Sequence, residues 1–282
     1  IPPKPMFFDK EVDTYIMDVL YGQDINALQY LISGPHQSGK SCLLTRFANI
    51  ALRKLQECSM LCDYYFFPFN FEKHAYELKN FTAFYLLFVR QTLTTITAFK
   101  FDLIPNIRGL LNWFMSIPFV GTLPAFPKVD QKEIGSRIQS VGNELFELLR
   151  SGEDMNAFIK AVLEFPNNMA KAIGLKGVVY VFDNLEFARV KLEGGQKFPR
   201  IMDPVPLQGL ITEVLSENLY IISPKNEEKF FNAFHMATEQ IIETVGVVRT
   251  MDLDEFTINN VPVTLTPKVC QGCTGYLTKY SE

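Results

Sequence analysis

The sequence predicts a three-layer α/β fold built around a mostly parallel sheet, and three observations support this prediction. Short apolar runs alternate with amphipathic helical patterns along the 282 residues. One run, residues 178–182 (VVYVF), is continuously apolar, as expected for a parallel strand that is buried on both faces. Another run, residues 27–33, leads directly into a glycine-rich turn, and an amphipathic helical pattern follows that turn.

The other elements follow in the same rhythm. Apolar residues recur every three or four positions in the segments where we expect helices, namely 9–21, 40–56, 81–99, 131–150, 154–173, 206–218 and 225–243. Strands are expected at 27–33, 64–67, 178–182 and 219–222, with a β-rich stretch over 245–265. Pro68 is expected to end the aromatic strand at 64–67. Residues 187–204 form a polar loop in this prediction.

Composition excludes several classes of protein. With 48% hydrophobic and 21% charged residues, the chain is expected to fold into a globule rather than remain disordered. The net charge of −4 offers no basic excess to a nucleic-acid backbone, so we expect no general nucleic-acid binding. Three histidines argue against a histidine-based metal or acid–base site. The odd number of cysteines, five, favours a reduced, cytoplasmic protein with buried thiols over a disulfide framework or a zinc site.

The chain ends suggest a piece of a longer polypeptide. Residue 1 is isoleucine rather than methionine, and no signal peptide follows it. We therefore expect further chain at the N-terminal side and an intracellular location.

An insertion is predicted between about residues 100 and 150. Residues 109–127 carry no charge, and their length approaches that of a membrane span, but Pro118, Gly121, Pro124 and Pro127 would break a spanning helix. We therefore expect no membrane role. Two alternatives remain for residues 101–128: a buried hairpin, or an apolar surface covered by a protein partner or by a second copy of the chain.

The sequence from Gly34 to Ser41, GPHQSGKS, matches the phosphate-binding pattern G-x-x-x-x-G-K-[ST] at every fixed position. The two glycines permit a loop whose N–H groups turn inward, and the following helix adds its positive dipole end. Lys40 is expected to reach the terminal phosphates, and the Ser41 hydroxyl to bind Mg²⁺. The residues expected to contact the phosphates are Gly34, Pro35, His36, Gln37, Ser38, Gly39, Lys40, Ser41 and Cys42.

Asp183 follows the apolar strand at 178–182, where the carboxyl ends of parallel strands place ligands. A phosphate-binding loop needs a second group in the magnesium shell, and Asp183 is the candidate, with a water between its carboxylate and the ion. The alternative for Asp183 is a helix cap or turn residue.

Together these motifs resemble the AAA+ and STAND-type ATPases. The order of motifs that carries the resemblance is Phe8-Asp9-Lys10-Glu11, the phosphate-binding loop, Asp183, Ser223 and Gly272-Cys273-Thr274-Gly275-Tyr276-Leu277. The resemblance implies a P-loop NTPase fold with strand order 5-1-4-3-2, bound ATP or ADP with adenine near residues 7–11, and a sensor role for Ser223 facing the γ-phosphate. It also implies a nucleotide-binding core over residues 1–266 and the start of a helical lid at 267–282.

One departure from this family affects the expected activity. Members that hydrolyse well usually carry glutamate directly after the metal-shell aspartate, whereas this chain has Asn184, which can orient water but cannot accept its proton. Glu186 is a candidate substitute, and no arginine finger can be assigned among Arg189, Arg200 and Arg249. The sequence therefore predicts an ATP- and Mg²⁺-binding switch with weak hydrolysis. The alternatives are a proficient oligomeric ATPase and a scaffold that retains the fold and bound nucleotide.

Overall fold

The computed structural model of the chain describes most of the residues between 64 and 226 and a few segments outside them. The described residues are 29–32, 40, 41, 44, 48, 64–99, 106–151, 155–188, 191–192, 205–226, 228–230, 234, 255–258 and 261–264. Several predictions fall outside them, namely those for residues 7–21, 34–39, 42 and 267–282.

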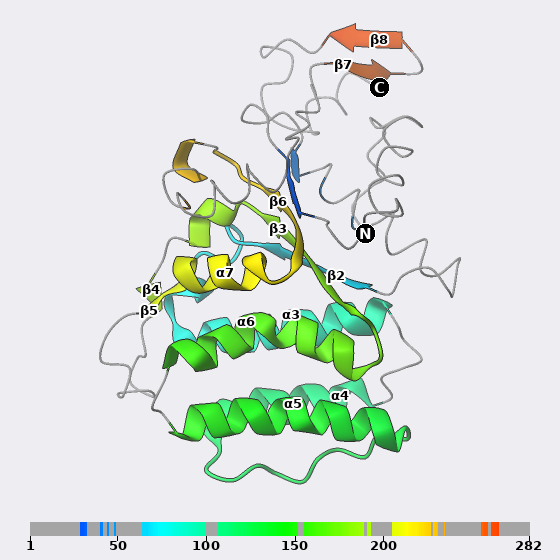
Figure 1. Cartoon of the computed structure of the whole chain (residues 1–282), viewed down its shortest axis with the longest axis vertical. Helices are drawn as coiled ribbons and strands as arrows, with labels where there is room; N and C mark the ends of the chain where they lie inside the picture. Colours follow the sequence, from blue (N-terminus) through cyan, green and yellow to red (C-terminus); the bar gives the residue numbers. More distant parts are fainter. Residues whose placement is uncertain are drawn as a thin grey trace.

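The main sheet contains four parallel strands in the spatial order β1-β6-β3-β2 (Figure 1). These strands are β1 (Gln29–Leu31), β6 (Leu219–Ser223), β3 (Gly177–Asp183) and β2 (Tyr64–Asn70). Every residue of β3 is buried, as expected for a central strand of a parallel sheet. The described part of the chain is therefore α/β with a parallel sheet, as the sequence predicts.

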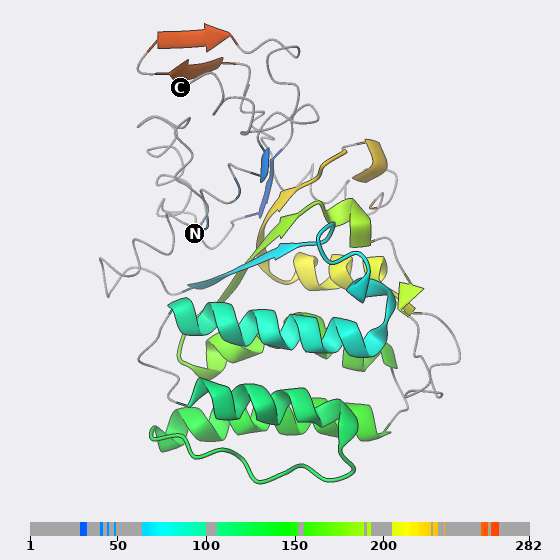
Figure 2. The ribbon, with the colours of Figure 1, turned by 180° about the vertical axis from the view of Figure 1, so that it is seen from behind.

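Two layers of helices lie on one side of this sheet (Figures 1 and 2). Helices α3 (Phe81–Phe99) and α6 (Met155–Ala172) pack against β2 and β3, and α7 (Leu207–Ser216) packs against α6. Helices α4 (Ile107–Ser116) and α5 (Lys132–Ser151) form the outer layer. The helix expected over residues 40–56 is described at only four positions, all helical.

Short elements complete the described structure. Three are single 3₁₀ turns: η2 (Glu77–Lys79), η4 (Ile117–Phe119) and η5 (Leu185–Ala188). Two antiparallel pairs join β4 (Lys191–Leu192) to β5 (Val205–Pro206) and β7 (Glu255–Ile258) to β8 (Val261–Thr264). The second pair falls within the predicted β-rich stretch.

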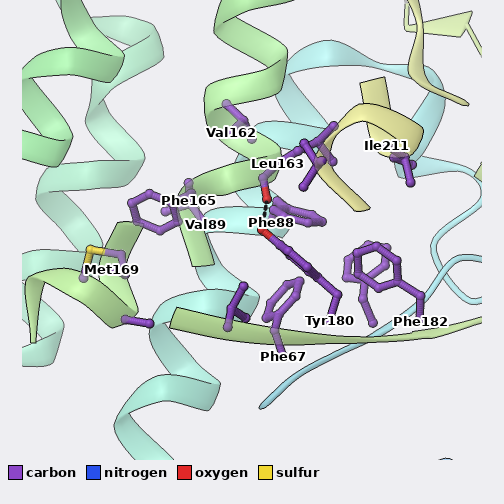
Figure 3. Close-up of a cluster of buried hydrophobic side chains, with 14 of the residues drawn as sticks. Phe67, Phe88, Val89, Val162, Leu163, Phe165, Met169, Tyr180, Phe182 and Ile211 are labelled. Atoms are coloured by element: carbon purple, nitrogen blue, oxygen red, sulfur yellow. Dashed lines mark hydrogen bonds between the residues drawn. The ribbon is translucent and has the colours of Figure 1, made fainter. Parts of the chain in front are cut away.

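Aromatic side chains fill the space between the sheet and the inner helices (Figure 3). The Phe67 ring of β2 lies with its centroid 5.0 Å from that of Phe88 on α3 and 6.2 Å from that of Tyr180 on β3, both edge-on. The buried Tyr180 hydroxyl donates a hydrogen bond to the Leu163 carbonyl of α6 at 2.8 Å. This bond satisfies the polar end of a ring that otherwise contributes only apolar surface to the core.

The prediction that Pro68 ends its strand is wrong, because β2 continues to Asn70. Alternate residues of a strand direct their N–H and C=O groups to opposite sides. The N–H of Phe71 donates to the Asp183 carbonyl of β3. Pro68 is three positions earlier, an odd number, so its backbone N and C=O face away from β3. On that side the Pro68 carbonyl accepts a hydrogen bond from Gln91 Nε2 at 3.3 Å. Because β2 is the outer strand in the described sheet, the missing N–H of Pro68 breaks no ladder bond.

The predicted insertion is helical, and its apolar segment begins as a helix rather than a hairpin. The Asn106 side chain caps α4 by accepting from the Gly109 N–H at 3.2 Å. Three large side chains of this helix are buried within the chain: Leu110, Trp113 and Phe114. Phe119, in η4, is 48% exposed. Within the described ranges, no helix combines the length and apolar character needed to span a bilayer.

Candidate functional site

Polar residues meet at the carboxyl edge of the main sheet. The register of the parallel strands pairs Asn70 of β2 with Asp183 of β3, and Asp183 with Ser223 of β6. Three neighbouring strands therefore end on a hydrogen-bonding side chain at the same level. This edge is where open parallel sheets bind their ligands.

Asp183 is the centre of this polar group. Its Oδ1 accepts a hydrogen bond from the Ser41 hydroxyl at 3.0 Å, and its Oδ2 accepts one from Asn70 Nδ2 at 2.8 Å. Ser41 lies 142 positions earlier in the chain, at a helical position just after β1 and the glycine-rich sequence. The structure thus brings together the two side chains that the sequence assigns to a Mg²⁺ ion.

The Asp183 carboxylate is only 8% exposed, and this burial is the main reason that its pKa lies above the ordinary value. The hydrogen bonds from Ser41 and Asn70 and from the Asn184 N–H oppose this shift, whereas the charge of Glu186 adds to it. A buried carboxylate whose charged form is disfavoured gains from a nearby cation, since the cation offsets the lost solvation.

Two further predicted residues are buried near the same edge. Lys40, directly before Ser41, is 5% exposed. Ser223 is 1% exposed, and its hydroxyl has no hydrogen-bond partner among the residues that the structure describes. A buried hydroxyl without a partner costs free energy, so its position beside Asp183 calls for a ligand or water.

Asn184 begins the turn that follows β3. Its backbone is left-handed, with φ 55°, a conformation that asparagine adopts more readily than most residues. Its N–H donates to the Ser223 carbonyl at 2.7 Å, and its side-chain Nδ2 donates to Glu72 Oε2 at 3.1 Å. Both the amide and the backbone of Asn184 are therefore fixed.

The structure directs the Glu186 side chain toward the segment after β6. Its two carboxylate oxygens accept from the backbone N–H groups of Lys225, at 3.3 Å, and Asn226, at 2.8 Å. The Lys225 ammonium in turn forms an ion pair with Glu72. Glu186 thus anchors the loop after Ser223 in this structure.

Sequence reasoning missed Asn70, Glu72 and Lys225. Asn70 ends β2 and contacts Asp183, and Glu72, two positions later in the turn, contacts Asn184. The residues of the prediction that the structure brings to the carboxyl edge are Ser41, Asp183, Asn184, Glu186 and Ser223. Residues 34–39, Cys42 and the arginines 189, 200 and 249 lie outside the described part of the chain.

Protein side chains alone do not form a metal cage in the described residues, where no group of three histidine, cysteine or acidic residues could hold an ion. At nucleotide sites, one or two side chains usually bind Mg²⁺ together with phosphate oxygens and waters. Ser41 and Asp183 are the two side chains that the sequence predicts for this role.

Comparison with known proteins gave no relatives: no family model matches the chain, and neither the curated proteins nor the solved structures contain a match. The assignment of a function to this edge therefore depends on its own residues.

The raised pKa of Asp183 makes a testable prediction for the metal-free protein. Between the ordinary value of 3.8 and the raised pKa, the folded state binds more protons than the unfolded state. The free energy of unfolding of the wild type, measured relative to Asp183→Asn, should therefore fall as pH rises through this window and stay constant above it. Denaturant unfolding of both proteins at several pH values tests this expectation; parallel curves would contradict it.

Proposed function

We propose that this chain is a P-loop NTPase domain that binds ATP with Mg²⁺ and acts as a slow nucleotide switch within a larger protein or assembly. The observation that carries the proposal is the 3.0 Å hydrogen bond between the Ser41 hydroxyl and the Asp183 carboxylate. Two residues 142 positions apart meet in the combination that a magnesium–triphosphate complex requires.

The sheet order supports the same function. Counted along the chain, the strands of the main sheet lie in the order first, fourth, third, second. That is the order 1-4-3-2 contained in the 5-1-4-3-2 order of the AAA+ and STAND-type ATPases, with Ser41 after the first strand, Asp183 on the third and Ser223 on the fourth.

The charges at the edge agree with a cation and a polyphosphate as ligands. Lys40 brings a buried positive charge beside Ser41, where phosphate oxygens would surround it. Asp183 brings a buried negative charge, which a Mg²⁺ ion would neutralise. The Ser223 hydroxyl, which has no partner among the described residues, supplies a donor at the same level of the sheet for a terminal phosphate oxygen.

The first test is the affinity for ATP, ADP and GTP, measured by calorimetry with and without Mg²⁺. We expect the wild type to bind MgATP, and Lys40→Ala to weaken this binding by about 10–100-fold, since a hydrogen bond to a charged group contributes about 1.5–3 kcal/mol. Lys132→Ala, at an exposed position in the outer helical layer, is the matched control and should bind as the wild type does. Unchanged affinity in Lys40→Ala, or no nucleotide binding by the wild type, would contradict the proposal and favour the scaffold alternative.

A further inference from the structure

Asn184 follows Asp183 and carries an amide, but the carboxylate of Glu72 forms a hydrogen bond with that amide. Asn184 Nδ2 donates to Glu72 Oε2 at 3.1 Å, across the boundary between the ends of β3 and β2. Asn70, the last residue of β2, donates to Asp183 at 2.8 Å. The end of β2 and the turn after it thus contribute one side chain each to Asp183, which ends β3, and to Asn184, which follows it.

Two glutamates lie near this corner, and their contacts differ. Glu186 accepts two backbone N–H bonds from Lys225 and Asn226, so its carboxylate fixes the loop after β6. Glu72 accepts only side-chain donors in the hydrogen bonds that the structure shows, namely Asn184 Nδ2 and Lys225 Nζ. The side chains of Asn184 and Lys225 therefore fix the orientation of the Glu72 carboxylate.

Accessibility also favours Glu72. Its side chain is 37% exposed and that of Lys225 is 38% exposed, so water reaches this carboxylate, whereas Asp183 is buried. Lys225 is itself fixed from two sides, because Glu186 holds its backbone N–H and its ammonium lies 5.8 Å from the centroid of the Phe187 ring. The resulting network aligns one solvent-exposed carboxylate near Asp183, the residue assigned to the metal.

We infer that Glu72 is the general base of this site and that Asn184 and Lys225 are its positioning residues. The inference rests on the proposed nucleotide function and deepens it, since it moves the proton acceptor from the turn after β3 to the turn after the neighbouring strand β2. Asn184 then has a defined purpose, because its amide donates a hydrogen bond to the Glu72 carboxylate. A glutamate at position 184 would instead repel that carboxylate.

The reaction is the hydrolysis of a nucleoside triphosphate by water. The water oxygen forms a bond to the γ-phosphorus, and the bond from the γ-phosphorus to the bridging oxygen breaks. The electron pair of that bond remains on the nucleoside diphosphate. Glu72 accepts the proton that the attacking water loses and passes it to the solvent, so charge and atoms balance without another reactant.

The test measures steady-state MgATP hydrolysis, its pH profile and MgATP affinity for the wild type, Glu72→Gln and Glu186→Gln. We expect Glu72→Gln to lower kcat by about 10²–10⁴-fold and to remove the acid limb of the profile, with MgATP affinity unchanged. Glu186→Gln should retain most of the activity, because its amide oxygen can still accept one of the two backbone N–H bonds that hold the loop after β6. Glu133→Gln, which removes a glutamate paired with Arg137 on exposed α5, is the matched control and should leave hydrolysis unchanged.

Two more variants separate catalysis from structure. Glu72→Asp retains a carboxylate and should keep part of the activity and the acid limb. Lys225→Met removes the ion pair but keeps the carboxylate, so it should lower kcat less than Glu72→Gln and retain the acid limb.

Several results would overturn the inference while MgATP binding leaves the proposed function intact. The first is full hydrolysis activity in Glu72→Gln, and the second is an equal loss of kcat in Glu72→Gln and Lys225→Met with unchanged pH profiles. The third is a large loss of kcat in Glu186→Gln instead of Glu72→Gln, and the fourth is no hydrolysis by the wild type. Loss of MgATP binding by the wild type would instead remove the proposed function itself.

Discussion

Replacing Phe67 with alanine is expected to lower the free energy of unfolding by about 3–5 kcal/mol, the usual cost of deleting a buried aromatic ring. Phe67 is fully buried, and its ring contacts aromatic rings on β2, β3 and α3. The cavity would therefore open between the sheet and the inner helices, where neighbouring rings cannot collapse without leaving their own partners. Since domains of this kind are stable by about 5–15 kcal/mol, this single change would remove a large part of the total. Denaturant unfolding followed by circular dichroism measures the effect.

Two matched variants define what the Phe67 result means. Phe67→Leu keeps most of the volume and should cost less than Phe67→Ala. Phe119→Ala removes the same ring at a position that is 48% exposed, and should change stability by less than about 1 kcal/mol. Equal losses at positions 67 and 119 would show that the aromatic cluster is not the core of the fold.

The strand and helix pattern was predictable wherever local sequence and burial agree. The apolar run at 178–182 predicted β3 because a strand buried on both faces has no polar alternation to obscure it. The helix predicted over residues 81–99 has those bounds in the structure. Pro68 was misread because its effect depends on which side of the strand lacks a partner, and that is a property of the sheet rather than of the sequence near Pro68.

The apolar segment at 101–128 shows a second limit. Its central residues 109–127 carry no charge, and this fits a buried helix and an exposed contact surface equally well, since both present apolar side chains. Only the position of α5 and α6 decides that Trp113 and Phe114 are buried, with Phe114 edge-on to Phe165 of α6. Trp113 also donates its indole N–H to the Pro124 carbonyl at 2.9 Å, which ties the proline-containing segment to α4.

The sequence predicted only part of the candidate site, because some of its residues become neighbours only in the folded sheet. Asp183 and Ser41 belong to motifs with fixed local spacing, so the sequence could assign them before any fold was known. Asn70 and Glu72 belong to no such motif. A signal for them did exist, because residues 68–72 (PFNFE) alternate in polarity and place both polar side chains on one side of an extended chain. Ending the strand at Pro68 removed that alternation from the prediction.

Replacing Asp183 with alanine should abolish most of the Mg²⁺ dependence of nucleotide binding. We expect MgATP affinity to fall by about 10–100-fold, the usual effect of losing an outer partner of a metal ion, while affinity for metal-free ATP changes little. The hydrogen bonds of Ser41 and Asn70 to this carboxylate would also be lost, so the Ser41 hydroxyl would lose the acceptor that holds it beside the ion. Calorimetric titration of ATP with and without Mg²⁺ measures both affinities.

Asp183→Asn and Asn70→Ala separate the two contributions to this loss. Asp183→Asn retains an oxygen that can accept from Ser41 but removes the charge, so it should lose Mg²⁺ dependence nearly as completely as alanine. Asn70→Ala keeps the charge and removes one donor, so it should weaken MgATP binding far less. Asp130→Ala, at an exposed position near α5, is the control. If Asp183→Asn kept full Mg²⁺ dependence, the carboxylate would act only as an acceptor that orders the sheet edge. If Asp130→Ala lowered the Mg²⁺ dependence of nucleotide binding as much as Asp183→Asn does, the loss would come from the overall charge of the protein.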